Sequence, residues 1–198
     1  MQEQQGVAHG EQPAEDEEIG RELPGLIIVH TGDGKGKTTA ALGLALRAVG
    51  NRYRVAVVQF IKGQWQPGEK KAAAHLPGLE FVPLGKGFTW TKTPDVHMAA
   101  MAAAWARTQE VIGAGRHEVV ILDEINYALA NTRIPVHEIF TVQDVVDLLR
   151  RRPAKMHVVL TGRYAKPEIV EIADLVTEMR LIKHPFQQGR RATRGIEF

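Results

Sequence analysis

Short apolar runs alternate along the chain with segments whose apolar residues recur every three or four positions. The first run, Leu26–His30, is rich in β-branched residues, which is typical of a buried parallel strand. Lys37–Val49 then repeats Ala and Leu at helical spacing and is followed by Gly50, which predicts a helix and its end. The chain therefore begins with a strand, a loop and a helix.

The same order continues to the C-terminus. Further strands are predicted at Val55–Phe60, Leu79–Pro83, Val119–Leu122, His157–Thr161 and Val176–Ile182. Further helices are predicted from Thr93-Pro94 to about Ile112, from the capping-box pattern Thr141–Asp144 to a stop before Pro153, and near Pro167–Ala173. Strands that alternate with helices predict an α/β fold, with a mainly parallel sheet and helices on both faces. In such sheets ligands lie beyond the C-terminal ends of the strands.

Charge divides the chain into two parts. Residues 1–22 carry seven acids and one arginine, a net charge of −6, whereas the whole chain of 198 residues carries +2. We therefore expect residues 1–24 to be an acidic, flexible segment and residues 25–198 to form one domain. The basic domain suits a polyanionic ligand, either a nucleotide or a nucleic acid, although an ordinary solvated surface would have the same composition.

Composition also limits where the protein works. The chain has no cysteine, which excludes disulfides and iron–sulfur clusters and fits a reducing compartment. No apolar run approaches the roughly 20 residues that span a bilayer, and the acidic N-terminus is unlike a secretory signal. We expect a cytoplasmic protein without a membrane partner.

A glycine- and lysine-rich loop follows the first predicted strand. Residues Thr31–Thr38 read Thr-Gly-Asp-Gly-Lys-Gly-Lys-Thr, a P-loop in which Thr31 stands in the place of the usual first glycine. Glycines let backbone N–H groups turn inward around an anion, and the following helix adds its positive end. Lys37 can reach the phosphates and Thr38 can ligate a divalent cation. A glycine-rich turn without a ligand is the competing interpretation.

Two acids follow a later strand. Asp123 and Glu124 end the run Val119–Leu122, and parallel strands would bring them to a cation bound by Thr38. The combination predicts a P-loop NTPase-like, RecA-like fold that binds a nucleotide with Mg²⁺ or Mn²⁺. Local chemistry leaves the reaction open, because Glu124 is either a base that activates water or a ligand of the metal.

Several stretches together resemble a known family. Residues 25–198 resemble the bacterial corrinoid adenosyltransferases of the CobA/CobO/BtuR type. The matching stretches are residues 25–39, Val-Val-Gln-Phe-Ile-Lys-Gly (57–63), Gly-Phe-Thr-Trp (87–90), Ile-Leu-Asp-Glu-Ile-Asn-Tyr (121–127), Thr-Gly-Arg (161–163), Lys-His-Pro-Phe (183–186) and the ending Gly-Ile-Glu-Phe. Members of that family also carry a threonine in place of the first glycine, as Thr31 does here.

The resemblance implies a reaction. A reduced Co(I) corrinoid attacks the 5′ carbon of ATP, forms a Co–C bond and releases triphosphate. The nucleophile then belongs to the substrate, so the protein needs only to position the reactants and neutralise charge. On this interpretation Lys37, Thr38 and Glu124 are the catalytic residues, and Thr38 and Glu124 bind the metal. The residues expected to bind substrates are Gly32, Asp33, Gly34, Lys35, Gly36, Lys37, Thr38, Thr39, Arg163, Phe88 and Trp90.

Phe88 and Trp90 have a separate role by resemblance. The family's Gly-Phe-Thr-Trp aromatics close off the lower face of the corrinoid, which eases reduction of Co(II) to Co(I). Core packing is the alternative for both side chains. Gln59, Lys62 and Glu69 follow the second strand and are weaker candidates for ligand contacts.

Partners follow mainly from the resemblance. It implies ATP and a corrinoid as substrates, an electron donor such as a flavoprotein reductase, and a homodimer, with no nucleic acid. Two other functions stay open: an ATPase associated with nucleic acid, and a nucleotide-gated chaperone that delivers a corrinoid. The acidic residues 1–24 depart from the basic N-terminal segment that family members often carry, and the arginines at 190, 191 and 194 are interpreted as solvated.

Overall fold

Six parallel strands form the centre of the protein in a computed structural model that describes residues 23–61, 68–84 and 94–197. The spatial order of the strands is β3-β2-β4-β5-β1-β6. Their bounds are β1 Ile27–Thr31, β2 Val55–Gln59, β3 Leu79–Phe81, β4 Val119–Asp123, β5 His157–Thr161 and β6 Leu175–Glu178. Because all strands run in one direction, their C-terminal ends share one edge of the sheet.

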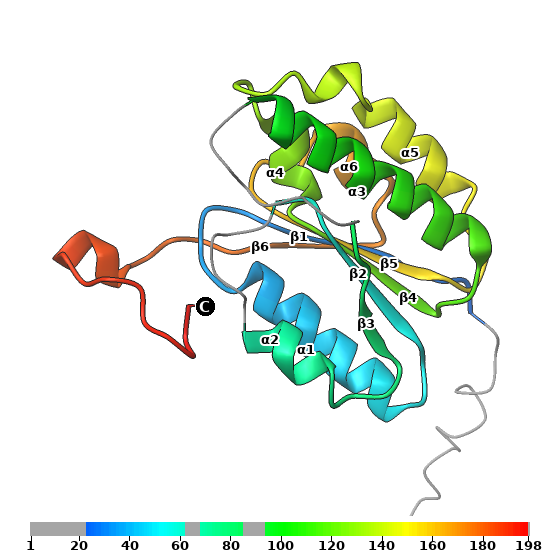
Figure 1. Ribbon diagram of the computed structural model, residues 1–198, viewed down its shortest axis with the longest axis horizontal. Coiled ribbons are helices and arrows are strands. Elements are labelled where there is room, and N and C mark those ends of the chain that lie inside the picture. Colours follow the sequence, from blue (N-terminus) through cyan, green and yellow to red (C-terminus); the bar gives the residue numbers. More distant parts are fainter. Residues whose placement is uncertain (1–22, 62–67, 85–93, 198) are drawn as a thin grey trace, which may run out of the picture.

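Helices cover both faces of this sheet (Figure 1). On one face lie α1 Lys37–Gly50 and α2 Gly68–Ala73; on the other lie α3 Pro94–Ala114, α4 Ile125–Ala130, α5 Val142–Arg150 and α6 Pro167–Ile172. Two 3₁₀ turns, η1 Val136–Glu138 and η2 Pro185–Gln188, complete the described elements. The predicted α/β fold with helices on both faces is confirmed.

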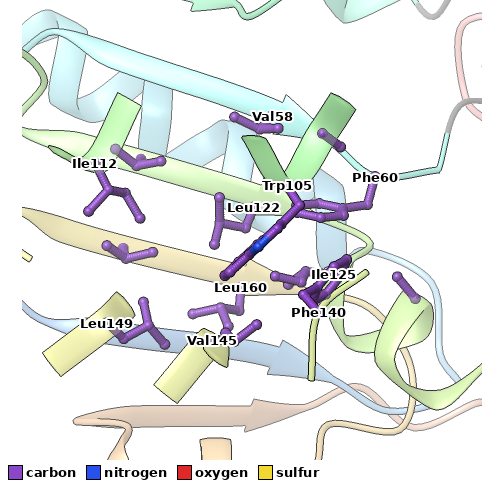
Figure 2. Close-up of a cluster of buried hydrophobic side chains, with 14 of the residues drawn as sticks. Val58, Phe60, Trp105, Ile112, Leu122, Ile125, Phe140, Val145, Leu149 and Leu160 are labelled. Atoms are coloured by element: carbon purple, nitrogen blue, oxygen red, sulfur yellow. The ribbon is translucent and has the colours of Figure 1, made fainter. Parts of the chain in front are cut away.

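Alternation along the strands divides the core into two layers. Val120 and Leu122 of β4 face the layer formed with α3, α4, α5 and α6, whereas Val119 and Ile121 face the smaller layer against α1. The larger layer is centred on stacked Trp105 and Phe140, whose ring centroids lie 4.7 Å apart (Figure 2). Small alanines on α1 let that helix lie close to the sheet. The phosphate loop therefore leaves β1 on the side of the smaller layer.

The predicted strands and helices are all present, with differences at their ends, and the two short helices α2 and α4 were not predicted. The predicted strand Val176–Ile182 is wrong in its second half, because β6 ends at Glu178. There the Met179 N–H donates to the carbonyl of Thr31 at 2.8 Å, and beyond Thr31 the neighbouring strand has ended. Gly50 was predicted to follow the end of the helix, but it is the last residue of α1, and Asn51 is the C-cap.

The capping box at Thr141 is confirmed. The Thr141 side chain accepts from the Asp144 N–H at 3.2 Å, and the Asp144 carboxylate accepts from the Thr141 N–H at 2.7 Å. These bonds satisfy two donors at the start of α5. The Thr141 hydroxyl also donates to the Asp144 carboxylate at 2.7 Å, and this bond, with the one from the Thr141 N–H, holds the pKa of Asp144 below its ordinary value. The predicted flexible segment 1–24 lies almost wholly outside the described residues. Thr93, predicted to begin the helix that continues from Pro94, also lies outside them. Within the described part of the chain, no helix is long and apolar enough to cross a membrane.

Candidate active site

The phosphate loop connects β1 to α1 in a conformation that depends on two glycines. Gly32 has φ 91° and Gly36, the residue before α1, has φ 109°, both in the region that favours glycine. A Cβ atom on Gly32 would lie 2.4 Å from the carbonyl oxygen of Met179, so the loop also packs against the chain that follows β6. Only glycine can therefore hold the loop in this place.

Lys37 lies inside the loop and is buried. Its Nζ donates to the carbonyls of Gly32 at 2.7 Å and Gly34 at 2.6 Å. Burial lowers the pKa of Lys37, and the negative charge of Glu124 acts in the opposite direction. The ammonium group is thus held at the centre of the loop, where a bound phosphate would meet it.

Asp123 is the centre of a hydrogen-bond network that links three strands to the loop. Its Oδ1 accepts from the hydroxyls of Thr38 at 2.9 Å and Thr161 at 2.8 Å. Its Oδ2 accepts from the Gln59 amide at 3.2 Å. Asp123 faces α1 because it has the same strand parity as Val119 and Ile121. The carboxylate is therefore fixed beside the Thr38 hydroxyl.

Glu124 follows Asp123 in a left-handed conformation with φ 62°. Its N–H donates to the Thr161 hydroxyl at 2.9 Å, which holds the turn between β4 and α4. Burial raises the pKa of the Glu124 carboxyl, as does the charge of Asp123, while Lys37 and Arg163 oppose the shift. Glu124 is thus a partly desolvated acid beside two cations, which is an environment typical of functional carboxylates.

One open cavity of about 1000 Å³ brings these groups together. Its walls come from the phosphate loop and α1, from the ends of β2 and β4, from the start of α2, from Arg163, and from the C-terminal segment 192–197. Of the predicted site residues, those that line it are Gly34, Lys35, Gly36, Lys37, Thr38, Thr39, Glu124 and Arg163. Gly32 and Asp33 belong to the loop but are not part of this wall, and Phe88, Trp90 and Lys62 lie outside the described residues.

The structure changes the importance of several residues that the sequence had already named. Asp123, not Glu124, contacts Thr38, and strand parity is the signal that would have distinguished them. Gln59 and Glu69, weaker candidates from sequence, both line the cavity. The arginines of the C-terminal segment were interpreted as solvated, and no contact was predicted for Glu197, which forms an ion pair with Lys35 at 3.2 Å. No local motif points to a contact between residues 162 positions apart.

The oxygen atoms around Thr38 suit a hard divalent cation as ligands. Mg²⁺ binds through oxygen atoms, usually those of one or two carboxylates and of the substrate phosphates. The Thr38 hydroxyl and the buried Asp123 carboxylate supply two such oxygens side by side, and Glu124 follows on the same strand end. The residues present therefore fit the cation that the phosphate loop implies.

Comparison with known families explains this arrangement. Residues 24–198 match the sequence model of the family described as ATP:corrinoid adenosyltransferase BtuR/CobO/CobP. The chain belongs to this family. The match covers all strands and helices described above, so this member is an adenosyltransferase of the type that the sequence resemblance implied.

Individual members of the adenosyltransferase family are closely similar. The chain is 47% identical over 177 residues to a corrinoid adenosyltransferase of Sinorhizobium sp, covering 88% of this chain and 80% of the relative. It is 42% identical to one of Escherichia coli K12, covering 88% and 86%, and 41% identical to the corrinoid adenosyltransferase CobA of Salmonella typhimurium LT2, covering 90% and 88%. The chain thus spans most of the length of each.

Solved structures place the fold among the P-loop NTPase-like proteins. The KaiC-like protein PH0186 of Pyrococcus horikoshii superimposes with a TM-score of 0.50 at 15% identity, covering 81% of this chain and 75% of that chain. The predicted RecA-like sheet is therefore confirmed. At this identity the likeness concerns the fold alone.

Proposed function

We propose that this adenosyltransferase binds the triphosphate of ATP on the loop Gly32–Thr39 and presents the ribose 5′ carbon to a reduced corrinoid. The observation that carries the proposal is the convergence of Lys37, Thr38 and Asp123 on one cavity at the C-terminal edge of the sheet. A cation, a hydroxyl and a carboxylate in this order suit a polyphosphate with its metal.

The reaction proposed here is a displacement at carbon. The Co(I) centre supplies an electron pair to the 5′ carbon, a Co–C bond forms, and the bond from that carbon to the triphosphate oxygen breaks. Triphosphate leaves with the bonding pair, and cobalt ends as Co(III). Negative charge therefore concentrates on the leaving group, which Lys35, Lys37 and the N-terminus of α1 neutralise.

The metal is proposed to be held by Thr38 and by the acids after β4. Mg²⁺ or Mn²⁺ supplies additional neutralisation of the triphosphate when it is bound. Glu124 acts here as a ligand rather than a base, because a displacement at carbon by cobalt requires no activated water. A nearby cation also favours the ionised form of Glu124 over the protonated form that burial favours.

The corrinoid is proposed to meet the ATP from the side of Arg163. The role of Phe88 and Trp90 in closing the lower face of the corrinoid stays a prediction from sequence. Arg163 is exposed at the cavity and is free to contact the nucleotide phosphates.

A spectral assay tests the function. Purified protein is mixed with chemically reduced cobalamin and MgATP under anaerobic conditions, and the absorbance of the light-sensitive alkylcobalamin is followed while released phosphates are identified. We expect alkylcobalamin and triphosphate in equal amounts. Orthophosphate release stimulated by DNA or RNA would instead support the nucleic-acid ATPase. Tight binding of adenosylcobalamin with negligible turnover would support the chaperone.

The cellular setting is also proposed rather than established. We expect a cytoplasmic homodimer that receives electrons from a flavoprotein reductase. Light scattering on a size-exclusion column measures the mass of the assembly. Reduction of Co(II) substrate by a purified reductase, compared with chemical reduction, tests the electron donor.

A further inference from the structure

The C-terminal segment Ala192–Glu197 forms part of the wall of the cavity in which the nucleotide is proposed to bind. Figure 1 shows the chain running away from β6 and returning to end beside the start of α1. Ala192, Gly195, Ile196 and Glu197 line the same cavity as the phosphate loop.

One ion pair connects the segment to the loop. Glu197 Oε2 lies 3.2 Å from Lys35 Nζ, and the Glu197 side chain is only 17% exposed while that of Lys35 is 60% exposed. Lys35 is the cation of the loop that faces outward, since Lys37 is buried within it. The carboxylate therefore sits where an anion approaching the loop from the cavity would arrive.

Other polar groups of the loop are also satisfied from within the chain. The Gly34 N–H donates to the Met179 carbonyl at 2.6 Å, and Lys37 Nζ donates to two loop carbonyls. A triphosphate that binds to these donors must replace partners that they already have. Lys35 differs from the other two because its partner is itself an anion.

We infer that the Glu197 carboxylate is a built-in competitor of the nucleotide: it holds Lys35 until a phosphate group replaces it, and the segment 192–197 then withdraws from the cavity. This inference rests on the proposed nucleotide site. Two anions on one lysine repel each other, and a triphosphate carries several negative charges against the single charge of Glu197. The polyphosphate and the Glu197 carboxylate therefore compete for Lys35.

The effect on affinity is modest because the pair is partly exposed. An exposed ion pair changes an equilibrium by about two- to fivefold. Glu197→Gln in the full-length chain should therefore lower the dissociation constant for MgATP by about this factor, measured by isothermal titration calorimetry. The gain should shrink as the salt concentration rises, because ions screen the pair.

A matched control separates this contact from a general change of charge. Glu171→Gln removes one acid from the exposed face of α6, away from the lining of the cavity, and should leave the affinity unchanged. If Glu197→Gln weakened MgATP binding, the carboxylate would be a ligand of the nucleotide and the inference would be wrong. Equal affinity of both variants and the wild type would also overturn it.

Trypsin provides a second, structural measurement. Cleavage after Arg194 releases the last four residues, which intact-mass spectrometry detects. In the wild type, saturating MgATP should accelerate this cleavage, because release of Glu197 from Lys35 frees the exposed segment around Arg194 to enter the protease. In Glu197→Gln the cleavage should be fast without nucleotide. Protection of Arg194 by MgATP would show that the segment closes over the nucleotide, contrary to the inference.

The two measurements also distinguish this inference from the proposed site. If the wild type bound no MgATP at all, the nucleotide site itself would be wrong and the inference would fail with it. If the wild type bound MgATP and Lys37→Ala did not, while Glu197→Gln behaved as the wild type in both measurements, the nucleotide site would stand and only the inference would fail.

Discussion

Asp123 and Glu124 are adjacent in the sequence but lie in different environments. Asp123 is still in β4 and points to the side of α1, where three side chains donate to it. Glu124 is in the left-handed turn beyond the strand, and beside it lie the charges of Lys37 and Arg163. The first is therefore a fixed anchor for Thr38, and the second is the acid whose ionisation depends on what enters the cavity.

Lys37→Ala tests the centre of the loop. We expect the affinity for MgATP to fall by roughly 10- to 100-fold, because hydrogen bonds to charged groups contribute about 1.5–3 kcal/mol. Adenosyl transfer should fall with it. Calorimetry measures the binding, and Lys35→Ala is the control. Its loss of affinity should be smaller, because the Lys35 side chain is 60% exposed and because a phosphate contact with Lys35 replaces the existing contact with Glu197. Equal losses in both variants would contradict the assignment.

Glu124→Gln separates activity from stability. Burial and the charge of Asp123 raise the Glu124 pKa above its ordinary value of 4.5, so the ionised form destabilises the folded state at pH 7. Below pH 4.5 the carboxyl is protonated in both folded and unfolded chains, and the difference disappears. We expect the variant to be inactive yet more resistant to urea at pH 7 without metal, and equal to the wild type near pH 4. Lower stability at pH 7 would count against this account.

At the scale of elements, strand order and helix length decide where each residue faces. Long amphipathic segments such as α1 and α5 were predictable, because periodicity and capping residues specify them locally. The six-residue helices α2 and α4 were not, because they are too short to show a period and are held by their neighbours. The end of β6 was also missed, since it depends on where β1 stops and not on β6 itself.

Two glycines test whether local propensity or tertiary packing determines the conformation at a position. Gly43 lies inside α1, and a methyl group there would meet nothing within 4 Å. Gly43→Ala should therefore raise the free energy of unfolding by about 0.5–1 kcal/mol. At Gly162, with φ 125°, a Cβ atom would lie 2.7 Å from the Tyr127 nitrogen. Gly162→Ala should lower the free energy of unfolding by at least about 1–3 kcal/mol. Urea unfolding of the two variants measures both changes in the free energy of unfolding. A change in the same direction for both variants would contradict the argument.

At the scale of the molecule, the proposed chemistry gathers at one edge of a single sheet. The location of the phosphate loop, the two acids after β4 and Arg163 was predictable, because parallel strands place their C-terminal ends together whatever their order. The return of the C-terminal segment was not, because it depends on a path of twenty residues after β6 that carries no periodic pattern.

Removal of residues 1–22 tests the proposed domain boundary. The proposed nucleotide site uses residues from position 32 onward, so a chain that begins at Leu23 should keep its affinity for MgATP. Corrinoid affinity, measured separately by absorbance, shows whether the acidic segment takes part in binding that substrate. Loss of MgATP binding with a normal unfolding transition would place part of the nucleotide site before Leu23, contrary to the boundary proposed.

The opposite edge of the sheet, where the strands begin, carries none of these groups among the described residues. There the Arg54–Glu118 ion pair joins the starts of β2 and β4 and lowers the Glu118 pKa to about 2. Turns at residues 51–54 and 115–118 lie a full strand length from the cavity. They are therefore the places where the enzyme can be lengthened, labelled or attached to a surface while its catalytic edge stays open to substrates.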